Sequence, residues 1–285
     1  MKILALGDFH GKFPERLKKE AKKADLILCA GDFAGDLNIT KLLFKYWKQG
    51  KIWHEEIGIK KARKLLKKDF NEGIKVLEQI NNLNKKTIII FGNGDYYRSW
   101  IFKGSKLKLN PGHYDDIIKR FKNIIYIHKK LIKINDLPIA GHGGYLDITE
   151  YLKRKTLKSI HSKKAHLKTL NRYKREEKEV LDLFKKNSNK LKDFIFLAHY
   201  PPYKVFDLIK NKESPLYNKH GGFEPYNQVI KKYQPLLYIC GHMHEYQGIK
   251  KLGKTTIVTT GPAYEGKAAL IDIEDKKIKS IKFLR

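Results

Sequence analysis

The sequence of 285 residues contains little cysteine and no long apolar run. Its two cysteines, Cys29 and Cys240, each lie inside a short apolar stretch, so we expect buried, reduced thiols of the kind that suits a cytoplasmic protein. No stretch approaches ~18 consecutive apolar residues, which excludes a membrane-spanning helix. Residues 1–7 lead directly into a strand-like run and a polar motif, which is not the pattern of a signal peptide.

Acidic residues are also scarce. Thirty Asp and Glu face 60 Lys and Arg, which gives a formal net charge of +30. Richness in lysine and isoleucine is typical of AT-rich genomes, but thermophile-like compositions of this kind usually raise glutamate as well. The excess of bases therefore favours attraction to polyanions, with nucleic acid first. The alternative is a solvated, self-repelling surface that has no specific partner.

The N-terminal part has the pattern of parallel βαβ units. Residues 2–6 and 26–30 are apolar strand-like runs on either side of an amphipathic helix at 13–23. Residues 36–83 form a longer excursion that ends in a predicted helix at 59–83, whose apolar residues fall on one stripe. Residues 87–91 form the third buried strand.

The remainder predicts more strands and two further helical regions. The predicted strands are 124–127, 131–134, 138–140, 194–198 and 236–240, with helices at 115–121 and 225–233. Residues 149–192 are strongly basic and predict a long helix or a helical hairpin. The tail alternates like an antiparallel meander with strands at 255–260, 268–273 and 278–283. Parallel units followed by a hairpin-rich tail favour two facing sheets with helices outside.

Polar motifs follow these strand-like runs along most of the chain. They are Asp8-Phe9-His10, Gly31-Asp32, Gly92-Asn93-Gly94-Asp95, the single His199, and Gly241-His242-Met243-His244. Because strands of an open α/β sheet place their ligands at the carboxyl edge, we expect these side chains to lie together. Carboxylate, imidazole and amide ligands without cysteine suit Mn, Fe, Ni or Zn. Seven ligands are about right for two ions that share a carboxylate, and two metals roughly 3.5–4 Å apart serve in-line displacement at phosphorus.

The motifs resemble those of the calcineurin-like metallophosphoesterases: D-x-H, G-D-x-x-[DG], G-N-H-[DE], a single H and G-H-x-H. The match spans Asp8 to His244 in the same order, with a longer spacing where residues 36–83 intervene. The resemblance implies an α/β fold, an αββα sandwich of two mixed β-sheets flanked by helices. It implies one metallophosphoesterase domain over residues 1–285, with helical insertions at about 36–83 and 149–192.

The resemblance also implies a dinuclear metal centre and the residues that hold it. Asp8, His10 and His244 would bind the first metal, Asp32 would bridge both, and Asn93, His199 and His242 would bind the second. The cofactors would be two divalent transition metal ions, manganese among the candidates. A water shared by two dications has a lowered pKa and supplies hydroxide near neutral pH, so Asp32 and Asn93 are also catalytic candidates.

One position departs from the family. Where the family has a histidine after the motif asparagine, this chain has Gly94. A general acid is typically worth about 10²–10⁴-fold in rate, so three interpretations are open. The substrate has a strained or good leaving group such as a cyclic phosphate, another side chain substitutes, or the chain is a weak enzyme. Candidate substitutes are His142, His220, Tyr97 and Arg98.

The leading hypothesis is a hydrolase, most simply a dimetal phosphodiesterase that acts on a nucleotide or a related phosphodiester through a metal-bridging hydroxide. The alternative is a nuclease, or a nucleic-acid-binding protein on the same fold with weak or no catalysis. Residues 149–192 would then serve as a basic arm. Asp95 matches the acidic position of the family motif and is expected to orient a neighbouring group or to cap its turn.

Overall fold

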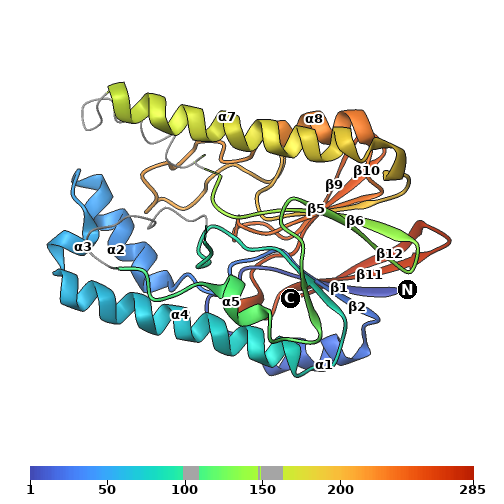
Figure 1. Cartoon of the computed structure of the whole chain (residues 1–285), viewed down its shortest axis with the longest axis horizontal. Coiled ribbons are helices and arrows are strands. Elements are labelled where there is room, and N and C mark those ends of the chain that lie inside the picture. The colour runs from blue at the N-terminus through green and yellow to red at the C-terminus, as the bar shows by residue number, and fades with distance from the viewer. Residues whose placement is uncertain (99–108, 147, 149–162) are drawn as a thin grey trace.

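Two six-stranded sheets pack face to face with helices on both outer faces in the computed structural model, which describes residues 1–98, 109–146, 148 and 163–285 (Figure 1). The order in the first sheet is β12 (Lys277–Leu284), β11 (Ala268–Glu274), β1 (Lys2–Leu6), β2 (Leu26–Cys29), β3 (Thr87–Ile89) and β4 (Ile124–Tyr126). The order in the second is β5 (Lys130–Ile134), β6 (Leu137–His142), β7 (Ile195–Ala198), β8 (Leu237–Cys240), β10 (Thr255–Thr259) and β9 (Gly248–Leu252). Each sheet is mixed, so the predicted αββα sandwich is confirmed.

The central strands are buried on both faces, which explains their unbroken apolar runs. In β1, Ile3 and Ala5 pack in the layer between the two sheets, whereas Leu4 and Leu6 pack against the outer helices. The second sheet repeats this alternation, with Ile195 facing the first sheet and Phe196 facing outward. Three apolar layers therefore hold the carboxyl ends of β1, β2 and β3 close to those of β7 and β8.

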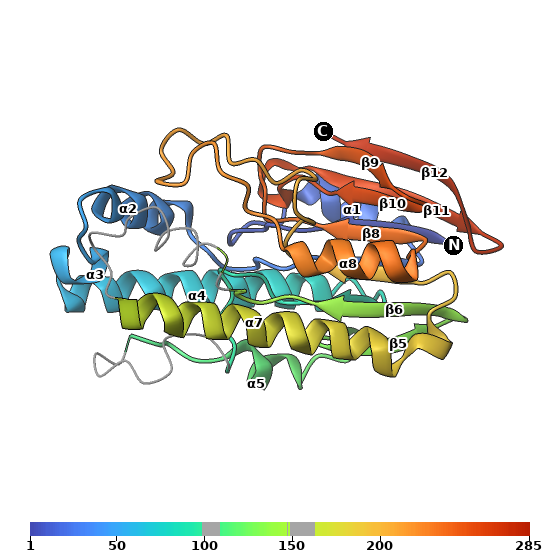
Figure 2. The same ribbon diagram turned by 90° about the horizontal axis from the view of Figure 1, so that it is seen from above.

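Helices cover the two outer faces (Figure 2). The first sheet carries α1 (Glu15–Lys23), α4 (Ile59–Asn81) and the short α5 (Tyr114–Ile118); the second carries α7 (Lys163–Lys186) and α8 (Glu224–Tyr233). Short 3₁₀ turns lie at Ser188–Lys190 and Ala263–Glu265. Within the described part of the chain, no helix is long and apolar enough to cross a membrane.

Residues 36–83 add three helices beyond the strand ends. They are α2 (Leu37–Lys48), α3 (Trp53–Glu56) and the first half of α4, which lie together at one end of the molecule (Figure 1). Trp53 is part of the apolar core between the first sheet and the helices that cover it. Within the basic segment 149–192, residues 149–162 lie outside the described part and α7 is a single helix. That these two segments are insertions in one domain stays a prediction.

The predicted C-terminal meander is wrong. Its three strands exist, but they belong to two hairpins in different sheets. β10 pairs antiparallel with β9 and parallel with β8 in the second sheet, whereas β11 pairs antiparallel with β1 and with β12 in the first. The connection 260–267 crosses from one sheet to the other. Strand β9 escaped prediction because the two lysines in its middle, Lys250 and Lys251, are exposed at the sheet edge.

Candidate metal centre

Four of the seven predicted ligands have a backbone conformation that is rare outside glycine. The φ angles are 58° at Asp8, 45° at His10, 56° at Asp32 and 70° at His242. Each such residue costs about 1–3 kcal/mol and persists only where the surrounding structure enforces it. Here each residue ends or follows a buried strand, and the left-handed turn directs its side chain toward the others. Strain concentrated in this way is typical of a functional site.

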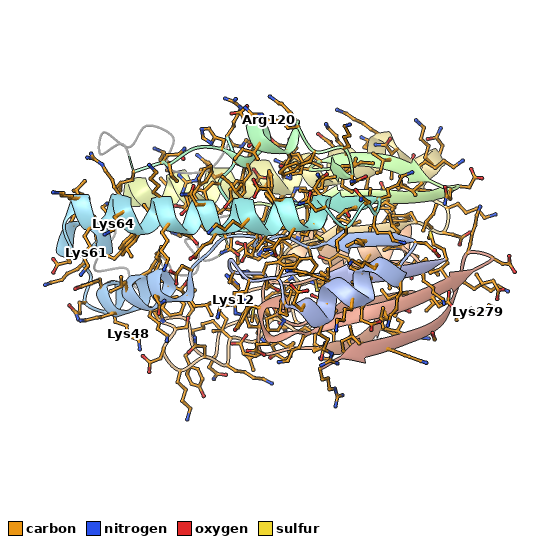
Figure 3. The ribbon with its side chains drawn as sticks, turned by 90° about the horizontal axis from the view of Figure 1, so that it is seen from below. Lys12, Lys48, Lys61, Lys64, Arg120 and Lys279 are labelled. Carbon is orange, nitrogen blue, oxygen red and sulfur yellow. The ribbon has the colours of Figure 1, made fainter. Side chains whose placement is uncertain are left out.

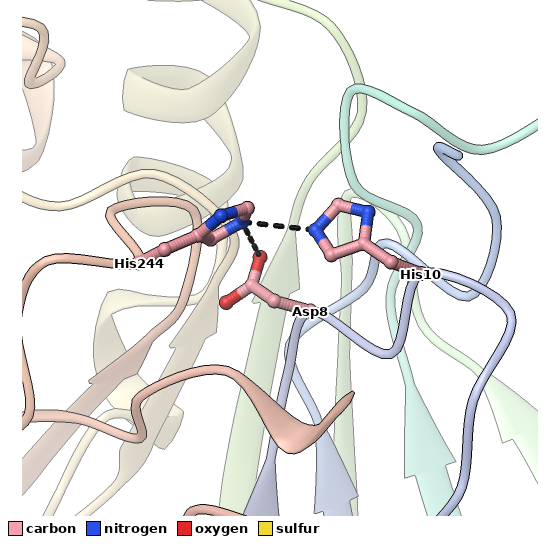
Figure 4. Close-up of side chains that lie close together, drawn as sticks. All are labelled: Asp8, His10 and His244. Atoms are coloured by element: carbon pink, nitrogen blue, oxygen red, sulfur yellow. Dashed lines mark hydrogen bonds and ion pairs between the residues drawn. The ribbon is translucent and has the colours of Figure 1, made fainter. Parts of the chain in front are cut away.

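The first set consists of Asp8, His10 and His244, whose donor atoms all lie within 4.8 Å of one another. His244 and His10 face each other across Asp8, with 2.9 Å between the two Nε2 atoms and 3.6 Å from His244 Nε2 to Asp8 Oδ1 (Figure 4). The Nδ1 of His10 donates to the carbonyl oxygen of Gly35 at 2.6 Å. This bond leaves the Nε2 of His10 as an acceptor aimed at the set.

The second set consists of Asp32, His199 and His242, with Asn93 beside it. The Nδ1 of His199 donates to the carbonyl oxygen of Ala30 at 2.7 Å, which again leaves its Nε2 as an acceptor. That Nε2 lies 2.8 Å from Asn93 Oδ1 and 3.5 Å from Asp32 Oδ2. Nitrogen and oxygen acceptors thus point at one another, an arrangement that a bound cation would satisfy.

Three of the four imidazoles of the centre are held in the neutral form that binds metals. Burial, followed by the charge of His244, lowers the pKa of His10 to about 4. Burial also lowers the pKa of His199, and it lowers that of His242 well below the ordinary value. Burial opposes protonation of His244 too, but the adjacent Asp8 carboxylate outweighs it and raises that pKa. Neutral imidazoles are the state that ligates a dication.

The two carboxylates respond in opposite ways to the same surroundings. Burial, followed by the charge of Asp8, raises the pKa of Asp32 to about 8. Burial acts on Asp8 in the same direction, but the interactions with His244 and the other imidazoles outweigh it and hold its pKa below the ordinary value. Two buried carboxylates this close need compensating positive charge. The donor set, its tautomers and its charge therefore fit two divalent cations.

Asp95 holds the loop that carries Asp32. Its two carboxylate oxygens accept hydrogen bonds from the backbone N–H groups of Asp32, Phe33, Ala34 and Gly92, at 2.8 to 3.1 Å. The sequence left open whether Asp95 orients a neighbour or caps its own turn. The structure shows that it ties the second motif to the third, which fixes the position of Asp32 beside His199 and His242.

A second buried carboxylate, Asp69 on α4, was not predicted. It accepts hydrogen bonds from the N–H groups of Gly35 at 2.9 Å and Asp36 at 2.8 Å, and from the hydroxyl of Tyr96 at 2.7 Å. Gly35 in turn supplies the carbonyl oxygen that orients His10. Asp69 therefore connects the helix of the 36–83 segment to the first set of ligands.

Gly94 lies directly at the centre. Its N–H donates to Asp32 Oδ1 at 2.7 Å. A Cβ built at this position would lie 3.2 Å from Gly35 Cα and 3.3 Å from Asp32 Oδ1, which is tight, although the φ angle is not left-handed. A side chain at residue 94 would thus begin beside Asp32, and glycine supplies no proton donor there.

The structure does not bring His142 or His220 to the seven ligands. His142 lies buried on the outer face of the second sheet, where its Nδ1 is 2.7 Å from the hydroxyl of Tyr226 and its Nε2 is 3.8 Å from a carboxylate oxygen of Glu176. His220 lies in the loop after β7 and pairs with Asp207 through its Nδ1 at 2.7 Å. Neither has a recorded contact with a ligand of the centre.

The other candidate substitutes are also engaged elsewhere. The hydroxyl of Tyr97 accepts a hydrogen bond from the N–H of Tyr145, and the guanidinium of Arg98 pairs with Asp116. A tyrosine from the connection between the two sheets, Tyr264, does lie at the centre. Its ring centroid is 5.4 Å from that of His10, and burial raises its pKa to about 12, so its hydroxyl stays protonated.

Known proteins share this architecture. A Methanocaldococcus jannaschii protein described as uncharacterized is 23% identical over 96% of both chains. The crystal structure of a Thermus thermophilus protein matches with a TM-score of 0.54 and 18% identity, over 100% of this chain and 99% of that one. A dimetal phosphatase from Danio rerio matches with a TM-score of 0.55 and 9% identity, over 96% and 93%. Identities this low between structures show a common fold.

The family assignment rests on a longer and more specific match. The model of the family described as calcineurin-like phosphoesterase matches residues 1–246, a range that contains all five motifs and both sets of candidate ligands. This chain therefore belongs to the calcineurin-like phosphoesterase family, which carries out metal-dependent phosphoester hydrolysis at a dinuclear metal centre.

Proposed function

We propose that this protein is a phosphodiesterase that acts on a nucleotide or a related phosphodiester at the centre formed by Asp8, His10, Asp32, Asn93, His199, His242 and His244. The observation that carries the proposal is the pair of facing acceptor sets, one around His10 and His244 and one around His199 and Asn93. Acceptors that face one another at hydrogen-bond distance are satisfied by a proton or by a metal cation between them, and the ligand types present here suit a divalent metal.

Each side chain has a definite part in this proposal. Asp8, His10 and His244 would hold one ion, Asn93, His199 and His242 the other, and Asp32 both. When bound, two divalent ions such as Mn, Fe, Ni or Zn lower the pKa of water and neutralise phosphate oxygens. Asp95 and Asp69 keep the two loops in place while substrate binds. Tyr264 packs beside His10 and His244, and its protonated hydroxyl hydrogen-bonds with the Glu265 carboxylate.

The choice of a diester follows from Gly94. A poor leaving group needs a proton as it departs, and the position that faces the centre carries no donor. A strained or acidic leaving group, such as that of a cyclic phosphate or an aryl diester, departs without one. We therefore expect diesters to be hydrolysed faster than monoesters that carry the same leaving group.

Paired aryl substrates test this choice. With Mn²⁺ supplied, kcat/KM for bis(p-nitrophenyl) phosphate should exceed that for p-nitrophenyl phosphate. A clear preference for the monoester would contradict the assignment as a diesterase, while leaving metal-dependent hydrolysis intact. No turnover of either substrate with any of the four metals would instead favour the second candidate.

That second candidate is a protein that binds nucleic acid on this fold with weak or no catalysis. The net charge of +30 and Gly94 favour it. Under either function we expect a cytoplasmic location, because Cys29 and Cys240 are free and buried, as in a reducing compartment.

A further inference from the structure

The helices next to the metal centre are unusually basic. Between residues 37 and 68, which cover α2, α3 and the first half of α4, ten Lys and Arg face only two acids, Glu55 and Glu56. All ten bases are exposed. They are Lys41, Lys45, Lys48, Lys51, Lys60, Lys61, Arg63, Lys64, Lys67 and Lys68. We call this set the α2–α4 basic face.

Most of these charges are not neutralised within the protein. Of the nine lysines of this face, only Lys48, Lys51 and Lys68 pair with a carboxylate of the described residues, and each of these pairs is exposed to solvent. Exposed ion pairs contribute little to the stability of the fold, so these lysines can readily pair with an external anion instead. Lysines such as Lys45, Lys61 and Lys64 have no carboxylate partner in that part of the chain, so the face repels itself unless an external anion covers it.

On the opposite helix, α7, most of the basic side chains are also exposed, whereas the acidic ones are partly buried. Lys129 lies between α7 and the second sheet, and it pairs with the two glutamates Glu176 and Glu179 of that helix. Two of the four acids of α7 thereby help to dock the helix, and the guanidinium of Arg175 lies 3.9 Å from a carboxylate oxygen of each of them. The exposed bases of its outer side are Lys168, Lys174, Arg175, Lys178, Lys185 and Lys186, which we call the α7 basic face.

The α2–α4 basic face and the N-terminal part of α7 lie at the end of the molecule where the strands deliver the metal ligands (Figure 1), whereas Lys185 and Lys186 lie at the C-terminal end of α7. The N-terminal parts of α4 and α7 extend past the carboxyl ends of the strands, one beside each sheet (Figures 1 and 2). Lys48, Lys61 and Lys64 lie at this end, whereas Lys279 of β12 lies at the other (Figure 3). The chain itself connects the two features, because α2 begins at Leu37, two residues after the carbonyl group that orients His10.

We propose that the α2–α4 and α7 basic faces bind the phosphate backbone of a polynucleotide and bring it to the metal centre. This inference rests on the proposed function, since it names a polymeric substrate for the same diester chemistry. A polynucleotide suits both features at once: it repeats the phosphodiester that the centre would cleave and carries a negative charge at each step. Contacts between lysine and phosphate do not distinguish one base from another, so we expect the protein to bind with little sequence preference.

Three charge-reversal variants test the proposal. One replaces Lys45, Lys61 and Lys64 with glutamate, and the second replaces Lys168, Lys174 and Lys178. The third is a matched control at the far end, with Lys277→Glu, Lys279→Glu and Lys282→Glu on β12; these three are also exposed. All three variants change the net charge equally. Fluorescence anisotropy measures the affinity for a labelled strand of about 20 nucleotides, alone and as a duplex, without added transition metal and over a range of salt.

The parent should bind with an affinity that falls steeply with salt. Each lost phosphate contact lowers the log–log slope by about 0.9 for duplex DNA and about 0.7 for a single strand. The first two variants each reverse three lysines, so they should lose about 3 in slope with the duplex, about 2 with the single strand, and roughly tenfold or more in affinity. The β12 variant should stay within about twofold of the parent, because its charges lie beyond a Debye length of about 10 Å from the bound strand. Thermal melts confirm that each variant is folded.

Three outcomes would overturn the proposal: no salt-dependent binding by the parent, equal losses in all three variants, or binding to phosphatidylserine vesicles but not to nucleic acid. Hydrolysis of bis(p-nitrophenyl) phosphate separates this inference from the proposed function. The small diester needs only the metal centre, so the first two variants should keep its kcat/KM. If the parent binds polynucleotide as expected but does not cleave the small diester, the proposed function fails and the binding surface stands.

Discussion

At the scale of single residues, the proposed preference for diesters depends on Gly94. It lies against Asp32 and the Gly35 backbone, where its family carries a histidine. Its ordinary φ angle means that a side chain can be introduced without left-handed strain, at the cost of a shift of a few tenths of an ångström in its neighbours. Position 94 is therefore a site at which an acid can be restored and its effect measured.

We predict that Gly94→His increases the hydrolysis of an alkyl phosphodiester, whose leaving group is poor, relative to Gly94→Ala. The alanine variant carries the steric cost of a Cβ without the acid, so the ratio of kcat/KM between the two variants isolates the acid. A general acid is worth about 10²–10⁴-fold in favourable geometry. Equal rates for the two variants would mean that Gly94 does not occupy the position of a proton donor.

At the scale of secondary-structure elements, α4 contributes more than a covering layer, because Asp69 holds the Gly35–Asp36 turn. Asp69→Ala should leave two backbone N–H groups unsatisfied, at a cost of about 1–3 kcal/mol each. Asp69→Ala should also bind metal more weakly at the first set of ligands, because the carbonyl group of Gly35, which orients His10, becomes mobile.

Tyr96→Phe is the matched control for Asp69→Ala. It removes the hydroxyl that donates to Asp69 but keeps both backbone bonds to the turn. Isothermal titration with Mn²⁺ compares the two. If Asp69→Ala and Tyr96→Phe bind metal with the affinity of the parent, while both melt at lower temperature, Asp69 serves stability alone.

The docking of α7 provides a test that depends on pH. Burial raises the pKa of Glu176, and the ammonium group of Lys129 opposes that rise. In Lys129→Met the pKa of Glu176 therefore rises further, and the ionised form destabilises the folded state. The loss of stability should be about 1–3 kcal/mol at neutral pH, since the pair is partly exposed, and should shrink as the pH falls and Glu176 takes up a proton. Melting curves at neutral and mildly acidic pH measure it; a loss that does not depend on pH would contradict the role of Glu176.

Some of these elements could be predicted from the sequence and others could not, and the difference has physical reasons. Strand ends followed by ligand-type residues are local signals, so the five motifs and the sandwich were predictable. The orientation of His142 also had a local signal, since alternation along β6 puts it on the same outer face as Ala140. Asp69 could have been noticed as a charge on the apolar stripe of α4, next to Phe70. The choice of sheet for each C-terminal hairpin had no local signal, because a hairpin alternates identically in either sheet.

At the scale of the whole molecule, the sandwich explains how motifs from residue 8 to residue 244 form one centre. β1, β2 and β3 deliver Asp8, Asp32 and Asn93 from one sheet, while β7 and β8 deliver His199 and His242 from the other. Neither sheet alone holds a complete set of ligands. Since each ion would bind groups from both sheets, we expect metal binding to stabilise the entire fold by RT ln(1 + [L]/Kd), about 2.7 kcal/mol at one hundred times Kd.

Metal content is the measurement that tests the central claim most directly. The parent and the variants Asp32→Asn, His10→Ala and His242→Ala are supplied with Mn²⁺, freed of unbound metal and analysed for manganese per chain. We predict two ions in the parent, a loss at one set in each histidine variant, and the largest loss in Asp32→Asn. The reason is our proposal that this carboxylate, which lies with His199 and His242, also binds the ion of the first set. One ion or none in the parent, or a full complement in Asp32→Asn, would contradict the dinuclear centre assigned to these residues.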